Sequence, residues 1–157
     1  MSKLPALLLV AFAFGTVVNS CPTGWTEGWS GAIIHFCYRY FPEEVNAQQA
    51  EARCQSYGAH LASIHGDEEN YDLFSLIWYP YSYVWIGLNN LNQSLSHYQW
   101  TDGTPYDYQH WGTRDDRHHC VQFSPQDPGY WSNGNCADRE HFLCKMIWDH
   151  PETTTTP

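Results

Sequence analysis

Six cysteines, Cys21, Cys37, Cys54, Cys120, Cys136 and Cys144, limit what this 157-residue chain can fold into. The compartment follows from residues 1–20, where Lys3 precedes an apolar run and the small residue Ser20 lies directly before Cys21. This pattern is typical of a cleaved signal peptide, and the run is shorter than the roughly twenty residues of a spanning helix. We therefore expect a secreted, extracellular protein without membrane insertion, whose cysteines form disulfides rather than free thiols or zinc thiolates. Spacing alone does not decide which cysteines pair.

The charge of the chain excludes two classes of partner. It contains 17 Asp and Glu against 7 Lys and Arg, which gives a net charge of −10, and removal of the signal peptide would remove Lys3 as well. Such a protein repels nucleic acid and anionic membranes. The charge also allows an acidic structural or matrix protein at a mineral surface, but the acids are scattered and form no run longer than Asp67-Glu68-Glu69.

Residue patterns divide the chain into a helical half and a loop-rich half. The aromatic and branched residues of Trp29–Phe41 predict a strand. Helical spacing and acidic first turns predict helices over Glu43–Tyr57 and Asp67–Trp78, the second with Tyr71, Phe74 and Trp78 as its apolar face. Short apolar pieces separated by Gly, Asn, Asp and Pro then predict four strands at Val84–Leu88, Tyr98–Trp100, Cys120–Phe123 and His141–Lys145.

These elements predict one α+β domain over residues 21–148, in which two helices flank antiparallel sheets with long loops, stapled by disulfides. Residues 149–157, rich in Thr and Pro, are too polar to join a core and are expected to be a disordered tail. The sequon Asn92-Gln93-Ser94 predicts N-glycosylation at Asn92 in an exposed loop.

Seven motifs occur in a characteristic order. They are CPTGW from Cys21, CYRYF from Cys37, AEARCQSYGAHLASI from Ala50, WIGL from Trp85, WTDGTPYDYQHW from Trp100, CVQF from Cys120 and YWSNGNCADREHFLCK from Tyr130. Together they resemble the C-type lectin-like domain in its long, six-cysteine form, over essentially all of the mature chain. The resemblance implies pairing of Cys21 with Cys37, Cys54 with Cys144 and Cys120 with Cys136. We assign to the core the large side chains within these motifs, Trp85, Ile86, Trp100, Trp111, Trp131, Phe142 and Leu143.

The resemblance implies a single-domain secreted lectin that binds sugar through calcium, held by carboxylate and amide oxygens. This sequence departs from that pattern. No Glu-Pro-Asn or Gln-Pro-Asp follows Trp111, His118 stands where a ligating Glu is expected, and Trp131-Ser132-Asn133 replaces Trp-Asn-Asp. The positions of a second family calcium site are Ser63, His65, Glu69 and Lys145, of which two are unsuited to calcium. The family tryptophan at the start of the first helix is Ala47 here.

We therefore expect no cofactor and no resident metal, with a standard calcium-dependent lectin as the alternative. The segment WGTRDDRHHC, from Trp111 to Cys120, has three interpretations: a solvated loop of alternating charge, a ligand-contact surface, or a zinc site built from imidazole and carboxylate. Adjacent histidines on an extended chain face opposite sides, which weakens the zinc interpretation. The candidate ligand-binding residues are Asp115, Asp116, His118, His119, Ser132 and Asn133.

Enzymatic activity has no support in the sequence. The chain contains no nucleophile elbow, no His-Glu-x-x-His and no phosphate-binding glycine loop, and oxidised cysteines supply no thiolate. We predict a non-enzymatic module of innate recognition that binds an extracellular carbohydrate or glycoprotein. The sequence names neither the ligand nor the oligomeric state.

Overall fold

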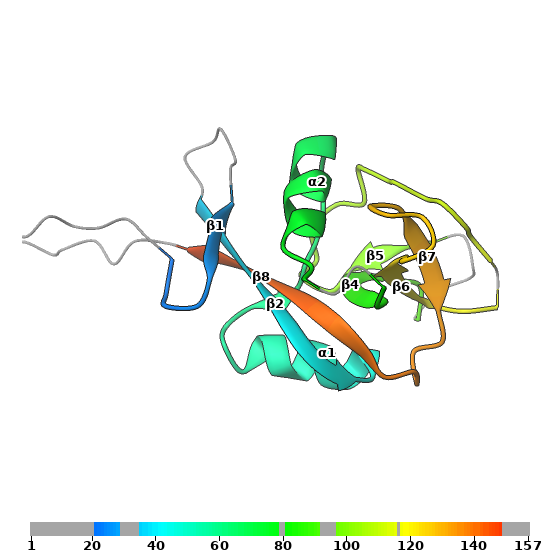
Figure 1. Cartoon of the computed structure of the whole chain (residues 1–157), viewed down its shortest axis with the longest axis horizontal. Coiled ribbons are helices and arrows are strands. Elements are labelled where there is room, and N and C mark those ends of the chain that lie inside the picture. The colour runs from blue at the N-terminus through cyan, green and yellow to red at the C-terminus, as the bar shows by residue number, and fades with distance from the viewer. Residues whose placement is uncertain (1–20, 29–34, 79–80, 92–96, 116, 149–157) are drawn as a thin grey trace, which may run out of the picture.

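The computed structural model describes residues 21–28, 35–78, 81–91, 97–115 and 117–148, which form an α+β domain as expected (Figure 1). The predicted signal peptide, the tail and Asn92 lie outside these residues. The elements are β1 (Thr26–Gly28), β2 (His35–Val45), α1 (Ala47–Gln55), β3 (His60–Leu61), α2 (Asp67–Ser75), β4 (Val84–Asn89), β5 (Gln99–Trp100), β6 (Cys120–Phe123), β7 (Trp131–Gly134) and β8 (Glu140–Trp148). Within the described ranges, no helix is long and apolar enough to cross a membrane.

The sheet has one long ladder and several short ones. Its order is β1-β2-β8-β4-β6-β7, with β3 beside β8 and β5 beside β4. Strands β2 and β8 pair antiparallel from His35↔Trp148 to Val45↔Glu140, with an irregularity between Phe41 and Val45, and form the two longest strands in Figure 1. Only β4 and β8 run parallel among the described pairs. The largely antiparallel sheet agrees with the prediction.

Helix α1 begins later than the sequence pattern predicted. Glu43 and Glu44 were expected in its first turn, but they extend β2, which continues past Pro42 to Val45. Asn46 then caps the helix: its side chain accepts a hydrogen bond from the Gln49 backbone N–H at 2.9 Å, while the Gln49 side chain accepts from the Asn46 N–H. This reciprocal capping box fixes the start of the helix. Of the strand predicted over residues 29–41, residues 29–34 lie outside the described residues.

Helix α2 starts at Asp67 as predicted, but it ends at Ser75 and buries a different face. The predicted apolar face was wrong for two of its three residues, because Tyr71 and Trp78 are 72% and 79% exposed, whereas Phe74 packs against the core. Leu73 and Asn70 are buried instead. The Asn70 amide accepts a hydrogen bond from Trp131 Nε1 at 2.8 Å and donates to the Gly129 carbonyl at 2.9 Å. This contact fixes which face of α2 is directed to the core, because a buried Asn70 amide without hydrogen-bond partners would be costly.

The four predicted short strands are present, with one large difference in length. The observed β6 has the predicted bounds, and β4 and β5 differ from theirs by one residue. Strand β8 extends well beyond the predicted 141–145, because its partner β2 continues on both sides of that stretch. Pairing along β2 therefore sets the length of β8, which its own residue pattern does not reveal.

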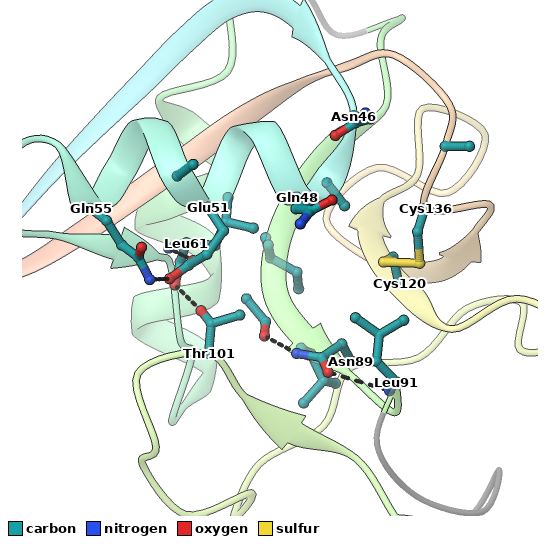
Figure 2. A pocket seen from close by; sticks show the side chains of 16 residues that line it. Asn46, Gln48, Glu51, Gln55, Leu61, Asn89, Leu91, Thr101, Cys120 and Cys136 are labelled. Carbon is teal, nitrogen blue, oxygen red and sulfur yellow. Dashed lines mark hydrogen bonds between the residues drawn. A yellow bond between two sulfur atoms is a disulfide. The ribbon is translucent and has the colours of Figure 1, made fainter.

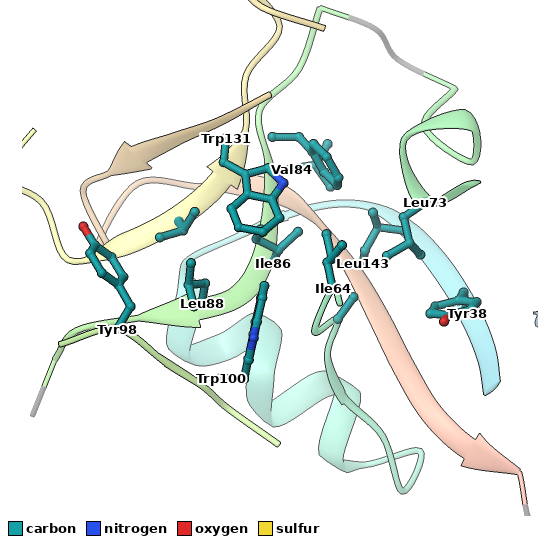
Figure 3. Close-up of a cluster of buried hydrophobic side chains, with 13 residues drawn as sticks. Tyr38, Ile64, Leu73, Val84, Ile86, Leu88, Tyr98, Trp100, Trp131 and Leu143 are labelled. Atoms are coloured by element: carbon teal, nitrogen blue, oxygen red, sulfur yellow. The ribbon is translucent and has the colours of Figure 1, made fainter. Parts of the chain in front are cut away.

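The core contains almost all of the side chains that the motifs assigned to it (Figure 3). Trp85 and Trp131 are fully buried, and each buried large side chain contributes roughly 1.5 to 3 kcal/mol. Trp85 Nε1 donates to the Val45 carbonyl at 3.1 Å, which satisfies its polar atom. Trp111 differs from the prediction, since it is only partly buried and packs against the edge of the core.

The three disulfides pair as the resemblance implies: Cys21–Cys37, Cys54–Cys144 and Cys120–Cys136. Cys54–Cys144 joins α1 to β8 across 90 residues. By chain entropy a loop of that length contributes roughly 4 to 5 kcal/mol. Cys120–Cys136 fixes the start of β6 to the chain that follows β7, and it thereby positions the candidate loop.

Candidate functional site

Asp115 organises the loop that the sequence singled out, residues 113–119, here called the 113–119 loop. Its Oδ1 accepts the backbone N–H groups of Arg117 at 2.8 Å and His118 at 3.0 Å. Its Oδ2 lies 3.0 Å from His118 Nδ1. The hydrogen bond from His118, helped by the two backbone bonds, holds the pKa of the Asp115 carboxyl below its usual range. The carboxylate therefore shapes the loop as an Asx turn.

Asn133 ties this loop to the sheet. Its Nδ2 donates to the Tyr98 hydroxyl at 2.9 Å and to the His118 carbonyl at 3.0 Å. Its Oδ1 accepts the Asp115 N–H at 3.1 Å. Both amide hydrogens and the amide oxygen are therefore engaged within the protein. In the C-type lectin-like pattern this is the position of a calcium-ligating carboxylate, and here a neutral amide is bonded to three protein groups instead.

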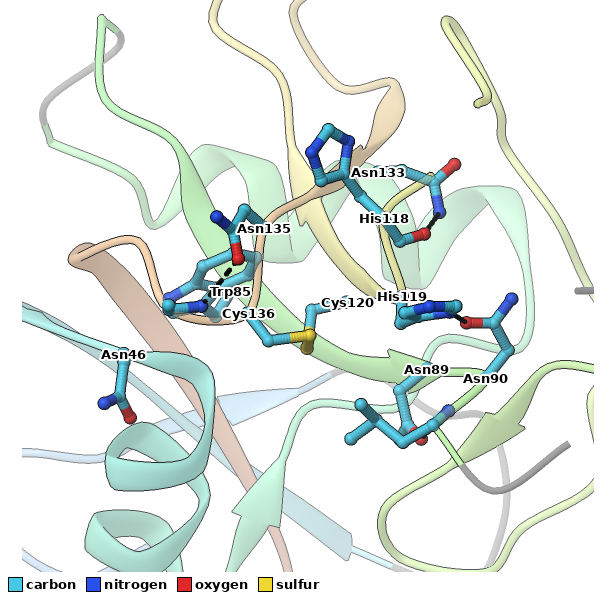
Figure 4. Close-up of a disulfide and its surroundings, with 12 residues drawn as sticks. Asn46, Trp85, Asn89, Asn90, His118, His119, Cys120, Asn133, Asn135 and Cys136 are labelled. Atoms are coloured by element: carbon cyan, nitrogen blue, oxygen red, sulfur yellow. Dashed lines mark hydrogen bonds between the residues drawn. A yellow bond between two sulfur atoms is a disulfide. The ribbon is translucent and has the colours of Figure 1, made fainter. Parts of the chain in front are cut away.

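The two adjacent histidines face opposite sides, as expected (Figure 4). His118 turns toward Asp115, while His119 Nδ1 lies 2.8 Å from Asn90 Oδ1 (Figure 4). The Asn90 N–H also donates to the His119 carbonyl. Of the imidazole–carboxylate pairs that the zinc interpretation allowed, the described residues bring together only His118 and Asp115. Among the residues that the structure describes, no three His, Cys, Asp or Glu side chains gather closely enough to hold a metal ion.

Two arginines give the loop cationic groups. Arg114 lies over the Tyr98 and Trp111 rings, with its Cζ 4.9 and 5.4 Å from their centroids. This cation–π contact holds its stem against the fold. Arg117 is 82% exposed and lies 3.8 Å from Asp115, too far and too solvated to contribute much stability. Its guanidinium is therefore available to a ligand.

Two of the predicted ligand-binding residues, Ser132 and Asp116, remain to be placed. Ser132 lies one residue before Asn133 in β7, and its side chain is buried, with no hydrogen-bond partner for its hydroxyl within the described part of the chain. It does not join the surface formed by Asp115 and His118. Asp116 lies outside the described residues. The structure thus brings together Asp115, His118 and Asn133, and separates His119 and Ser132 from them.

The second family calcium position is occupied by a protein ammonium group. Lys145 Nζ donates to Glu69 Oε1 at 2.6 Å and to the Ser63 carbonyl at 3.1 Å, and its side chain is 5% exposed. Glu69 also accepts the Tyr38 hydroxyl at 2.6 Å and the His65 N–H at 2.8 Å. Burial and the charge of Glu69 raise the pKa of Tyr38. This buried centre, Lys145 with Glu69, Ser63 and Tyr38, contains its own cation.

The sequence analysis missed side chains that support the 113–119 loop but lie outside the segment Trp111–Cys120. Tyr98 was treated only as part of a strand, yet its hydroxyl accepts from Asn133. A stack of Tyr108, His110 and Tyr130 rings supports the approach to the loop, with His110 4.3 Å from Tyr130. The alternation of rings in YDYQHW was a signal for such a stack, although Tyr130 comes from a distant segment.

The family model described as the lectin C-type domain matches residues 43–146 of this chain. The chain belongs to the C-type lectin family. This family has a non-enzymatic carbohydrate-recognition fold, in agreement with the predicted absence of catalysis. "Regenerating islet-derived protein 4" of Rattus norvegicus is 36% identical over 152 residues, covering 88% of this chain and 93% of its own.

Two solved structures share the fold. A calcium-independent type II antifreeze protein is 29% identical, with a TM-score of 0.73 over 82% of this chain and 95% of its own. The cow C-type carbohydrate-recognition domain of CD23, solved in the presence of a GlcNAc2Man3 oligosaccharide, is 26% identical, with a TM-score of 0.73 over 83% and 98%. The fold is thus found in a protein described as calcium-independent and in a carbohydrate-recognition domain.

Proposed function

We propose that this C-type lectin is a secreted recognition module that binds an extracellular carbohydrate or glycoprotein through the 113–119 loop without calcium. The observation that carries the proposal is the Asn133 amide, which is bonded to Tyr98, His118 and Asp115. Calcium needs about six to eight oxygen ligands, several of them charged. An amide already engaged in three hydrogen bonds supplies no charge, and its oxygen already accepts the Asp115 N–H.

The buried Lys145 centre supports the same conclusion at the second family position. Its ammonium lies 2.6 Å from Glu69 Oε1, so a calcium ion there would meet a like charge at short range. Both positions at which the family binds calcium are therefore served by protein groups.

The 113–119 loop offers groups suited to sugar hydroxyls and acidic sugars. Asp115 supplies a carboxylate with 30% side-chain exposure, and Arg117 an exposed guanidinium. His118, with its Nδ1 at Asp115, leaves its other ring nitrogen for a ligand. Charge-assisted hydrogen bonds from such groups recognise hydroxyl and carboxylate pairs. Because the Asx turn and Asn133 fix the loop, little ordering is needed when the ligand binds.

The test is a glycan array probed in calcium and again in EDTA. We expect the same glycans to be bound with the same strength in both. Binding that EDTA abolishes and calcium restores would establish the standard mechanism instead. To place the site, Asp115→Ala with His118→Ala should weaken binding about tenfold, as expected for loss of charged hydrogen bonds. The matched control Glu68→Ala removes an exposed acid of α2 and should leave binding unchanged.

A further inference from the structure

A cavity of about 710 Å³ lies between α1 and β4, away from the 113–119 loop (Figure 2). This volume is within the range of small-molecule sites, roughly 300 to 1,000 Å³. One wall is the Cys120–Cys136 disulfide, and Gln48 and Glu51 of α1 lie across the space from Leu91. Cys120 lines the cavity, but Asp115, His118 and Asn133 do not. The two sites are therefore distinct.

Small residues create the cavity. Ala47, Ala52 and Ala137 line it, together with Gly87 of β4. A side chain at Gly87 would meet the Leu61 carbonyl oxygen at 2.6 Å, so the backbone packs tightly there. At Ala47, by contrast, the C-type lectin pattern has a tryptophan, and a small residue in place of a large one leaves space when the surroundings do not collapse.

The interior of the cavity is apolar, and the polar side chain of Asn89 within it is already paired. Leu61, Ile86 and Leu88 line it with the disulfide. Asn89 donates to the Gly87 carbonyl at 3.2 Å and so presents little unsatisfied polarity. A ligand would therefore gain affinity mainly by burying apolar surface.

The charge at the mouth selects among apolar ligands. Glu51 is the one charged side chain among the described lining residues, which include no Lys, Arg or His. Its side chain is 17% exposed, and its carboxylate accepts from His60 at 2.6 Å, from Gln55 and from the Leu61 N–H, so a cationic ligand would compete with His60 for it. With a chain charge of −10, the rim disfavours anions. Asn46 and Gln48 add amide groups at the same edge.

We propose that this cavity is a second binding site, for a small ring-bearing apolar molecule that is neutral or cationic. The proposal does not depend on the 113–119 loop or on the absence of calcium. The ring lies against Leu88 and the disulfide, and a cationic substituent points to Glu51.

Three compounds with one ring system and different charge test this site: indole, tryptamine and indole-3-acetate. Each is titrated into the full mature protein, with backbone amides followed by NMR. We expect indole and tryptamine to shift the amides of Ala47, Leu88 and Cys136 saturably, with tryptamine binding up to about fivefold tighter through Glu51. Indole-3-acetate should be the weakest. Absence of saturable shifts at these amides with all three compounds, or tightest binding by indole-3-acetate, would overturn the proposal.

Variants that fill the cavity provide a second test of this site. Ala47→Trp should abolish indole binding, and Ala137→Phe should do the same from the exposed rim, where folding is not at risk. Gln109→Phe adds the same ring at an exposed position of the long loop and should leave indole binding unchanged. Undiminished binding in Ala137→Phe, with its three disulfides intact, would place the ligand elsewhere and contradict the proposal. Glu51→Gln should reduce the preference for tryptamine over indole to about one.

Discussion

The two positions at which the C-type lectin pattern places calcium ligands carry different groups in this chain. At the buried Lys145 centre, one ammonium group is surrounded by a carboxylate, a carbonyl and a tyrosine hydroxyl. At Asn133, a neutral amide joins three groups beside a half-exposed loop. A buried charge without its partner is far more costly than a lost neutral hydrogen bond. The first centre therefore stabilises the scaffold, and the second orders the partly exposed 113–119 loop, which we propose as the ligand-contact surface.

The largest effect is expected at the buried centre. Lys145→Met removes the cation and leaves Glu69 without its partner, which should lower the free energy of unfolding by about 3 to 5 kcal/mol. Urea unfolding measures the loss. The double variant Lys145→Met with Glu69→Gln should recover much of it, because no charge is then left unpaired. A loss below about 1 kcal/mol in the single variant would show that the ion pair is not desolvated enough to matter.

A smaller loss of stability, with a larger effect on the loop, is expected at Asn133. Asn133→Ala removes three hydrogen bonds and should lower the free energy of unfolding by about 1 to 3 kcal/mol. Hydrogen exchange at the Asp115 amide should become fast, while exchange along the β2–β8 ladder should not change. Equal loss of protection in both regions would mean that Asn133 supports the whole fold rather than the loop.

Low pH should loosen the 113–119 loop of the unmutated protein by protonating Asp115. The pKa of Asp115 is lowered in the folded protein from its ordinary value of 3.8, chiefly by the hydrogen bond from His118. The stability that the ionised Asp115 carboxylate gives to the folded loop is therefore fully present above pH 3.8. It is lost as the pH falls through the lower, folded-state pKa. The Arg117 and His118 amides should lose protection in that range. Asp115→Asn retains an acceptor but does not titrate, so a loop that still opens there in this variant would contradict the assignment.

The smallest effect on stability is expected at Arg117. The guanidinium is 82% exposed, so Arg117→Ala should change the free energy of unfolding by less than about 0.5 kcal/mol. It should nevertheless weaken capture of acidic sugars on the glycan array. A variant that unfolds more easily but binds normally would reverse the roles given to this surface and the scaffold.

The scaffold was largely predictable from the sequence because its signals are local or carried by ordered motifs. The cysteine pairing, three of the four tryptophans assigned to the core and the acidic start of α2 agreed with the structure. The misassigned features depend on distant partners. Glu43 and Glu44 favour a helix start, but they lie in the irregular stretch of β2 between Phe41 and Val45, which pair with β8 on either side of it. Tyr71 and Trp78 fit a helical face, but Asn70 turns α2 toward Trp131.

The residues of the candidate loop were predictable from the sequence, but their hydrogen-bond partners were not. Its motif named Asp115, His118 and His119, and the alternation of an extended chain correctly separated the two imidazoles. The link from Asn133 to Tyr98 spans 35 residues, and that from Lys145 to Glu69 spans 76. Such contacts are set by the sheet register, which the residues of the loop do not encode.

The most direct test of the account is thermal unfolding of the mature protein in calcium and in EDTA, with a calorimetric calcium titration. A site at a hundredfold excess of calcium over its Kd would stabilise the fold by about 2.7 kcal/mol. We predict the same melting temperature in both buffers and no saturable heat, because Lys145 and Asn133 already serve the two positions. A higher melting temperature in calcium, with saturable binding that Asn133→Ala removes, would contradict the account.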